Sequence, residues 1–127
     1  MKEIISRITD SELEILRVLW ASENELTFAE IRTILVEQTD WEVSTIKTLL
    51  RRLCKKEVVL ATKKEVFYYK ALISEEEYLE YSTQSLIDRV FLGSAKNLVA
   101  SLLGNNKLEK RDIEELREIL KEGDKDE

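Results

Sequence analysis

The chain has 127 residues, of which 43% are hydrophobic and 36% charged, and its formal net charge at pH 7 is −6. This length suits one domain of ordinary size, or a small domain with an appended interaction module. One cysteine excludes an intramolecular disulfide, no apolar run reaches the length of about 18 residues that a membrane span needs, and the N-terminus lacks the apolar segment of a signal peptide. We expect a cytoplasmic protein, mostly helical because it has no proline and only three glycines.

Two capping boxes open the first two predicted helices. Thr9 with Glu12, and Thr27 with Glu30, have the spacing in which each side chain of the pair caps the backbone amide of the other. The first helix is predicted to end near Ser22. Helical spacing predicts the inward faces, which are Leu13, Leu16, Val18, Leu19 and Trp20 in the first helix and Ile31, Ile34 and Leu35 in the second.

The segment 41–56 is predicted to form a third helix with two different faces. One face is an apolar stripe of Ile46, Leu49, Leu50 and Leu53, and the other carries hydroxyls and cations. From residue 43 to residue 64 there are seven Lys or Arg against one acid, a local charge of +6 in a protein whose net charge is −6. Three short helices, the third of them basic on its outer side, indicate a helix-turn-helix.

Two strands are predicted next, over 58–62 and 66–70, because both segments are rich in β-branched and aromatic residues. A hairpin in this place is the wing of a winged helix, and its turn at 63–65 is placed to reach a phosphate or the minor groove. Tyr68 and Tyr69 alternate along the second strand, so we expect one to pack in the core and the other to face outward.

Three amphipathic helices are predicted after the wing. A third capping box, Ser74 with Glu77, opens a helix that runs to about residue 91. The others cover about 94–103, where Gly104 and two asparagines indicate a stop, and about 109–122. Three such helices bury little surface alone, so we predict a homodimer. Its apolar contacts are predicted to be Leu79, Leu86, Ile87, Val90, Leu98, Leu102, Ile113, Leu116 and Leu120.

The basic cluster predicts a polyanionic partner, double-stranded DNA. Residues 75–127 hold 8 basic and 14 acidic side chains, which accounts for the net charge of −6 and assigns that half to protein contacts. The predicted base-reading residues are Ser44, Thr45, Lys47, Thr48 and Arg51. The predicted phosphate-holding residues are Arg52, Lys55, Lys63 and Lys64. The alternative is a solvated basic face, or one that docks an acidic protein.

No pattern in the sequence indicates an enzyme. The chain has no histidine, which removes the commonest general base, and one cysteine without histidine cannot make a thiolate–imidazole metal site. We expect no cofactor and no metal. Cys54 lies beside the apolar stripe of the third helix, and we expect a small buried thiol there.

The chain resembles the family of the penicillinase and methicillin-resistance repressors and the copper-operon repressors. The matching segments run nearly end to end and are 8–14, 18–20, Trp41, 45–50, Leu53, 55–56, 66–67, Tyr69, 74–78, 112–116 and 119–120. The resemblance implies a homodimeric transcriptional repressor on an inverted-repeat operator, typically of TACA/TGTA type. Its fold would be mostly α with a small β-hairpin, with a winged helix-turn-helix over 1–72 that binds DNA and a three-helix module over 73–127 that dimerises.

In the β-lactam branch of this family, the resemblance implies a link to antibiotic resistance. A membrane-bound sensor protease system triggers cleavage in the C-terminal region, and the repressor then leaves its operator. The positions that match the cleaved bond are Ser101 and Leu102. Two other readings stay open, which are a winged-helix protein–protein adaptor and a repressor released by a small molecule.

Three departures from the family pattern bear on these expectations. The copper branch carries a C-terminal Cys-x-Cys motif, and this chain has no cysteine after Cys54, which excludes copper sensing by that route. Glu57 stands where the family has a glycine, so the third helix must end without a glycine cap. Glu42 replaces the serine that caps this helix in the family, which leaves Asp40 as the candidate cap.

Overall fold

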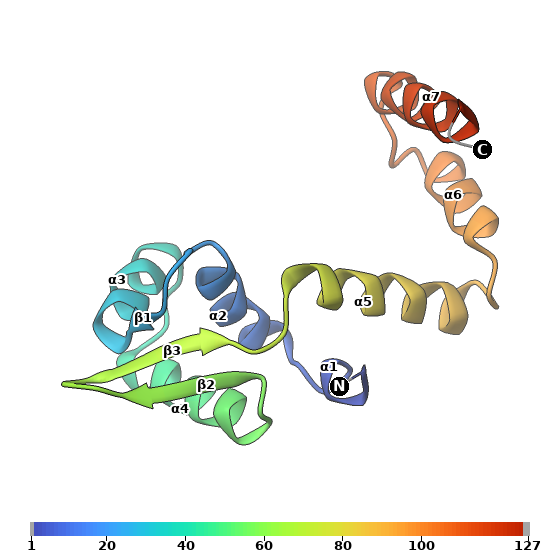
Figure 1. Ribbon diagram of the computed structural model, residues 1–127. Helices are drawn as coiled ribbons and strands as arrows, with labels where there is room; N and C mark the ends of the chain where they lie inside the picture. The colour runs from blue at the N-terminus through green and yellow to red at the C-terminus, as the bar shows by residue number, and fades with distance from the viewer. Residues whose placement is uncertain (1, 126–127) are drawn as a thin grey trace. The chain divides into compact units, whose positions relative to one another are not determined.

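The computed structural model describes residues 2–125, and the chain divides into two compact units, Met1–Thr83 and Gln84–Glu127. Seven helices and three strands are described within these residues (Figure 1). In chain order they are α1 (Lys2–Ile5), α2 (Asp10–Trp20), β1 (Leu26–Thr27), α3 (Phe28–Gln38), α4 (Val43–Lys55), β2 (Val59–Lys63), β3 (Phe67–Ala71), α5 (Glu75–Val90), α6 (Ala95–Gly104) and α7 (Lys110–Lys125).

The first unit combines three packed helices with a small antiparallel sheet. The strand order is β1-β3-β2, and the hairpin register pairs Val59 with Ala71 and Lys63 with Phe67. α2 packs against α3, α4 and β3, while α4 also packs against β2. Both hairpin strands lie one residue later than predicted, and β1 was not predicted because its two residues cannot show a period of two. The predicted winged helix is confirmed.

The three capping boxes predicted at helix starts are confirmed in detail. At α2 the backbone N–H of Thr9 donates to Glu12 Oε1 at 2.9 Å, and the N–H of Glu12 donates to Thr9 Oγ1 at 3.2 Å. Such reciprocal bonds satisfy two amides that have no partner inside the helix. The predicted boxes that form are Thr9–Glu12, Thr27–Glu30 and Ser74–Glu77.

The core of the first unit lies between the helices and the inner face of the hairpin. The predicted stripe of α4, namely Ile46, Leu49, Leu50 and Leu53, is buried as expected. Leu13, Trp20 and Ile34, also predicted to face inward, are half-buried. The core further includes Ile5 from α1, a four-residue helix too short to predict from periodicity. Tyr69 packs against this core and Tyr68 is half-buried.

α4 ends in a left-handed residue that is not glycine. Glu57 has φ 62°, the N–H of Val58 donates to the carbonyl of Leu53 at 3.0 Å, and the N–H of Glu57 donates to the carbonyl of Cys54 at 3.0 Å. These two bonds form a Schellman motif. α4 therefore ends without glycine, as predicted, but Glu57 adopts the left-handed backbone conformation that glycine usually supplies at this position. A side chain at this φ is strained.

We expect Glu57→Gly to raise the free energy of unfolding by about 1 kcal/mol, because glycine adopts a positive φ without steric cost. Equilibrium urea unfolding measures the change. Glu57→Gln removes the charge and keeps the Cβ, so it is the matched control and should leave the stability unchanged. A glycine variant no more stable than the glutamine variant would contradict the strain argument.

The second unit contains the later part of α5 together with α6 and α7. Of residues 84–123, Ile87 alone is buried, and several large apolar side chains are exposed. The most exposed of them on α7 are Ile119 and Leu120, at 61% and 68%. Each unit has its own helices, but only the first has an apolar core within the described residues. No helix within 2–125 combines the length and the apolar character needed to cross a membrane.

Candidate nucleic-acid interface

The outer side of α4 carries a continuous polar stripe. Ser44, Thr48, Arg51 and Lys55 follow one another at intervals of three or four residues, so they share one face of the helix, opposite the buried stripe. All are exposed except Thr48, which is half-buried and whose Oγ1 accepts from Arg51 Nη2 at 3.3 Å. We call these four residues the α4 outer stripe. The structure therefore brings together four of the nine predicted DNA contacts on one line.

A groove runs along one side of the outer stripe, between α4, the start of α3 and the hairpin. It has a volume of about 800 Å³ and a mostly apolar lining that includes Phe28, Leu50 and Phe67. Lys47 and Arg51 stand at this groove, and Lys47 Nζ lies 5.6 Å from the centroid of the Phe28 ring, a cation–π contact. These two cations can therefore approach a ligand that lies against the α4 outer stripe.

The opposite side of the outer stripe is flanked by hydroxyls and one cation. Thr45 and Arg52, both exposed, line a shallow hollow together with Ser44, Thr48 and Leu49. No acidic side chain occurs in the first turn of α4, and the helix N-terminus is positive by its own dipole. Every predicted DNA contact on α4 thus reaches the surface. Four of them form the outer stripe, Lys47 lies on one side of it, and Thr45 and Arg52 lie on the other.

The start of α4 differs from the prediction. The N-cap residue is Glu42, which makes no side-chain hydrogen bond to the first turn. The expectation that Asp40 caps instead is wrong, because the chain before α4 is extended and Thr39 Oγ1 accepts the N–H of Trp41 at 3.2 Å there. Within the described residues the side chains of Asp40 and Glu42 make no such bond. The N–H of Thr45 donates to the Glu42 carbonyl at 3.0 Å, so the amides open to another acceptor are those of Val43 and Ser44.

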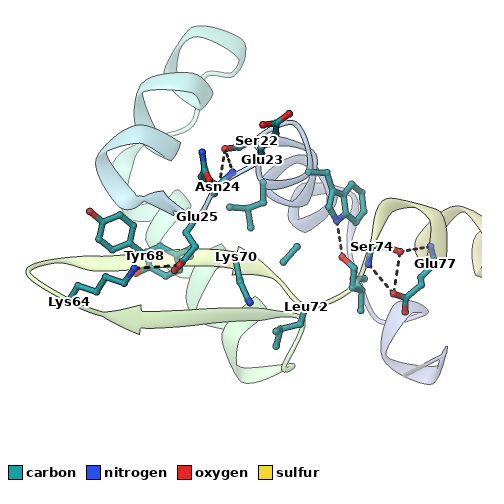
Figure 2. Close-up of a pocket in the computed structure, with 15 residues that line it drawn as sticks. Ser22, Glu23, Asn24, Glu25, Lys64, Tyr68, Lys70, Leu72, Ser74 and Glu77 are labelled. Carbon is teal, nitrogen blue, oxygen red and sulfur yellow. Dashed lines mark hydrogen bonds and ion pairs between the residues drawn. The ribbon is translucent and has the colours of Figure 1, made fainter.

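The wing presents two lysines with different surroundings. Lys63 Nζ lies 5.8 Å from the centroid of the Phe67 ring. Lys64 Nζ lies 5.0 Å from the Tyr68 ring centroid and 3.5 Å from Glu25 Oε1, and Figure 2 shows Lys64 directed toward that carboxylate across a hollow beside β3. An exposed pair of this kind is weak, but it lowers the positive charge that Lys64 offers to a polyanion.

One cation counted in the basic cluster is not free. Lys56 Nζ donates to Glu12 Oε1 at 2.6 Å and to the carbonyl of Arg7 at 2.8 Å. Burial raises the pKa of Glu12, but hydrogen bonds from Lys56 and Thr9 outweigh it and hold the pKa below its ordinary value of 4.5. The carboxylate is therefore charged at neutral pH, and the pair is internal. Sequence reasoning assigned Glu12 only to the capping box.

Burial also raises the pKa of the Cys54 thiol, which is half-buried at the apolar groove, so the thiol stays protonated at neutral pH. The same cause, with the nearby Cys54, raises the pKa of Tyr69. Within residues 2–125 no three acidic or cysteine side chains are grouped so that they could hold a metal ion.

The predicted dimerisation and cleavage residues lie on α5, α6 and α7. In the single chain Leu79, Leu86, Val90, Leu116 and Leu120 are exposed, Leu98, Leu102 and Ile113 are half-buried, and Ile87 is buried. Ser101 and Leu102 are half-buried in α6, within its last turn. The carbonyl of Ser101 accepts both the N–H of Asn105 at 3.1 Å and its side-chain amide at 2.8 Å.

The solved structures that resemble this one contain the same winged helix. The solution structure of the DNA-binding domain of the repressor BlaI matches with a TM-score of 0.53 and 35% identity, and covers 58% of this chain and 90% of that one. The monomeric form of Bacillus licheniformis BlaI, in complex with the blaP half-operator, matches with a TM-score of 0.50 and 35% identity, over 56% of this chain and 87% of that one.

Sequence comparison extends the similarity over nearly the whole chain. Residues 8–122 match the family model described as penicillinase repressor. The penicillinase repressor of Bacillus licheniformis is 34% identical over 119 residues, which cover 93% of this chain and 92% of the relative. The methicillin resistance regulatory protein MecI of Staphylococcus aureus (strain N315) is 31% identical over 117 residues, with coverage of 89% and 92%. The chain belongs to the penicillinase repressor family.

Proposed function

We propose that this protein is a cytoplasmic transcriptional repressor that binds an inverted-repeat DNA operator as a homodimer. The observation that carries the proposal is the α4 outer stripe. It aligns Ser44, Thr48, Arg51 and Lys55, of which Thr48 is half-buried and the other three are exposed. An α-helix with such a face fits the major groove, where hydroxyls and cations meet base edges. Family membership supports the proposal, since one relative is named a penicillinase repressor and another a methicillin resistance regulatory protein, and one similar structure contains a half-operator.

The position of each side chain supports a division of roles on α4, which we call the recognition helix. Ser44, Thr45, Lys47, Thr48 and Arg51 lie at its start and middle and read base edges. Arg52 and Lys55 hold phosphates along the recognition helix, as do Lys63 and Lys64 on the wing. Phosphate contacts carry affinity and fix register, while the few base contacts carry selectivity.

The second unit supplies the dimer contacts in this proposal. Leu116, Ile119 and Leu120 form an exposed apolar stripe at helical spacing on α7. A symmetric dimer covers such a stripe with the same stripe of a second copy. The acidic excess of residues 75–127 keeps this part of the chain away from DNA, so it joins two DNA-binding units without competing for the operator.

Release in this proposal follows cleavage of the Ser101–Leu102 bond, triggered by a membrane sensor protease system that responds to a β-lactam or cell-wall signal. The bond lies inside α6, which ends at Gly104, so few residues must unwind to expose it. The side-chain amide of Asn105 donates to the Ser101 carbonyl, and this hydrogen bond must break before the last turn of α6 unwinds. A cut there separates α7, and with it the whole exposed apolar stripe, from the DNA-binding unit.

A mobility-shift titration tests the proposal. Full-length protein is titrated against a duplex with a TACA/TGTA inverted repeat and against a scrambled duplex, over a range of salt concentrations. We expect a retarded complex on both at low salt and selective retention on the inverted repeat as salt rises. If no retarded complex forms at low salt, the repressor function is contradicted, and a winged helix that docks another protein is favoured.

The ion pair at the wing gives a further prediction. Glu25→Gln frees Lys64, so we expect operator binding about 2- to 5-fold tighter, with a salt dependence steeper by up to about one phosphate contact. Glu23→Gln removes the same charge from the same loop without touching Lys64, and it is the matched control. Equal effects of the two variants in a salt titration would show that only net charge matters.

A further inference from the structure

The most deeply buried polar group of the first unit is the carboxylate of Glu12, whose residue is 0% exposed. Its Oε1 accepts from Thr9 N–H at 2.9 Å and from Lys56 Nζ at 2.6 Å, while its Oε2 is buried with no hydrogen-bond partner among the described residues. Lys56 Nζ also donates a hydrogen bond to the carbonyl of Arg7. One ion pair thus joins the N-terminal segment, the start of α2 and the C-cap of α4.

The two other capping boxes show that this pair is not needed to start a helix. Glu30 makes the same two bonds with Thr27, at 2.9 and 3.2 Å, and Glu77 pairs with Ser74 in the same manner. Both of these glutamates are exposed, and neither takes part in an ion pair between described residues. Among these three glutamates, Glu12 alone combines the capping role with an ion pair to a half-buried cation, Lys56, at the end of α4.

This pair costs the Glu12 carboxylate its hydration and Lys56 part of its hydration. Well-packed apolar residues of similar size often stabilise a fold as well as a buried ion pair does, or better. A gain in overall stability is therefore a weak explanation for the presence of this ion pair. Its geometry is restrictive, however, because Lys56 Nζ must reach Glu12 Oε1 and the Arg7 carbonyl at the same time, at 2.6 and 2.8 Å, which narrows the heights and rotations that α4 can take on α2. The leucine and isoleucine stripe of α4 tolerates small shifts, whereas a hydrogen-bonded ion pair does not.

The end of α4 transmits this restraint along the helix. The Schellman bonds at Glu57 fix the backbone on both sides of Lys56, so Lys56 cannot move without α4. Arg51 lies five residues before the C-cap Lys56, a little more than one helical turn away. A shift or rotation at Lys56 therefore moves the guanidinium of Arg51 and the outer stripe by a similar amount.

We propose that Glu12 and Lys56 are positioning residues of the recognition helix: the ion pair between the buried carboxylate and the half-buried lysine sets the place of α4 on α2 and thereby the operator selectivity, and neither side chain touches DNA. This inference rests on the proposed DNA binding. It predicts that the pair can be replaced without loss of folding but not without loss of selectivity.

The test compares the wild type with Glu12→Leu/Lys56→Met, an apolar pair of similar volume. We expect a thermal midpoint close to that of the wild type and an operator affinity lowered about tenfold, the cost of one lost base contact, with unchanged affinity for random duplex. Lys56→Arg keeps a cation with donors for both acceptors, and we expect it to retain selectivity. Glu77→Leu removes a capping glutamate without an ion pair and should leave selectivity unchanged.

Several outcomes decide the inference. A folded double variant that keeps wild-type selectivity overturns it, as does an equal loss on operator and random duplex. If the double variant does not fold, Glu12→Asp, which keeps the charge and shortens the reach, must lower selectivity in its place. If the wild type itself binds no DNA, the proposed function fails, and amide hydrogen exchange of α4 decides the positioning role. Faster exchange in the double variant then supports positioning, and equal exchange overturns it.

Discussion

Replacing Leu116 and Leu120 with aspartate is expected to lower operator affinity by about 10²- to 10⁴-fold, the range over which linking two binding modules raises avidity. Both leucines are exposed in the single chain, at 38% and 68%, so the change should leave each chain folded. In the proposed dimer the same leucines face a second copy, and burying two charges there is unfavourable. Sedimentation equilibrium and an operator titration measure the two effects together.

The control for this prediction is Arg111→Gln/Lys121→Gln. It lowers the charge of α7 by the same two units, and neither residue lies three or four positions from Leu116 or Leu120. We expect this control to remain dimeric with little change in operator affinity. If the aspartate variant also stays dimeric, or binds the operator as the wild type does, the apolar stripe of α7 is not the dimer contact.

Arg51→Ala is expected to lower operator affinity by about 1–3 kcal/mol, or roughly 5- to 150-fold, the discrimination that one good bidentate base contact supplies. Binding to random duplex should fall far less. Arg51 is the cation nearest the middle of the α4 outer stripe, and it is held there by a hydrogen bond to Thr48. Its guanidinium offers the planar pair of donors that matches a guanine edge.

Arg52→Ala is the matched control, because Arg52 is the next residue but lies on the other flank of α4, at the hollow beside Thr45. As a phosphate contact, it should weaken binding to operator and random duplex alike and flatten the salt dependence by about one phosphate. Fluorescence anisotropy with both duplexes, at several salt concentrations, separates the two arginines. Equal losses on both duplexes for Arg51→Ala would show that Arg51 only holds phosphate.

The sequence predicted most of the features that depend on a few neighbouring residues. The capping boxes at Thr9, Thr27 and Ser74 and the buried stripe of α4 formed as expected, because each is set by contacts within one or two helical turns. The hairpin was predicted with an error of one residue, which is the usual uncertainty of an element boundary. α1 and β1 are too short to produce a periodic signal.

By itself, then, the sequence determined the helices, the wing and a basic face on one helix in an acidic protein. Only the tertiary structure decided which cations of that helix and of the wing are available to a partner. Lys56 forms an ion pair with the buried carboxylate of Glu12, which lies 44 positions away, and Lys64 forms an ion pair with Glu25. No local pattern marks such pairs, because they form only when packing brings distant segments together, and that packing is set by the whole apolar core.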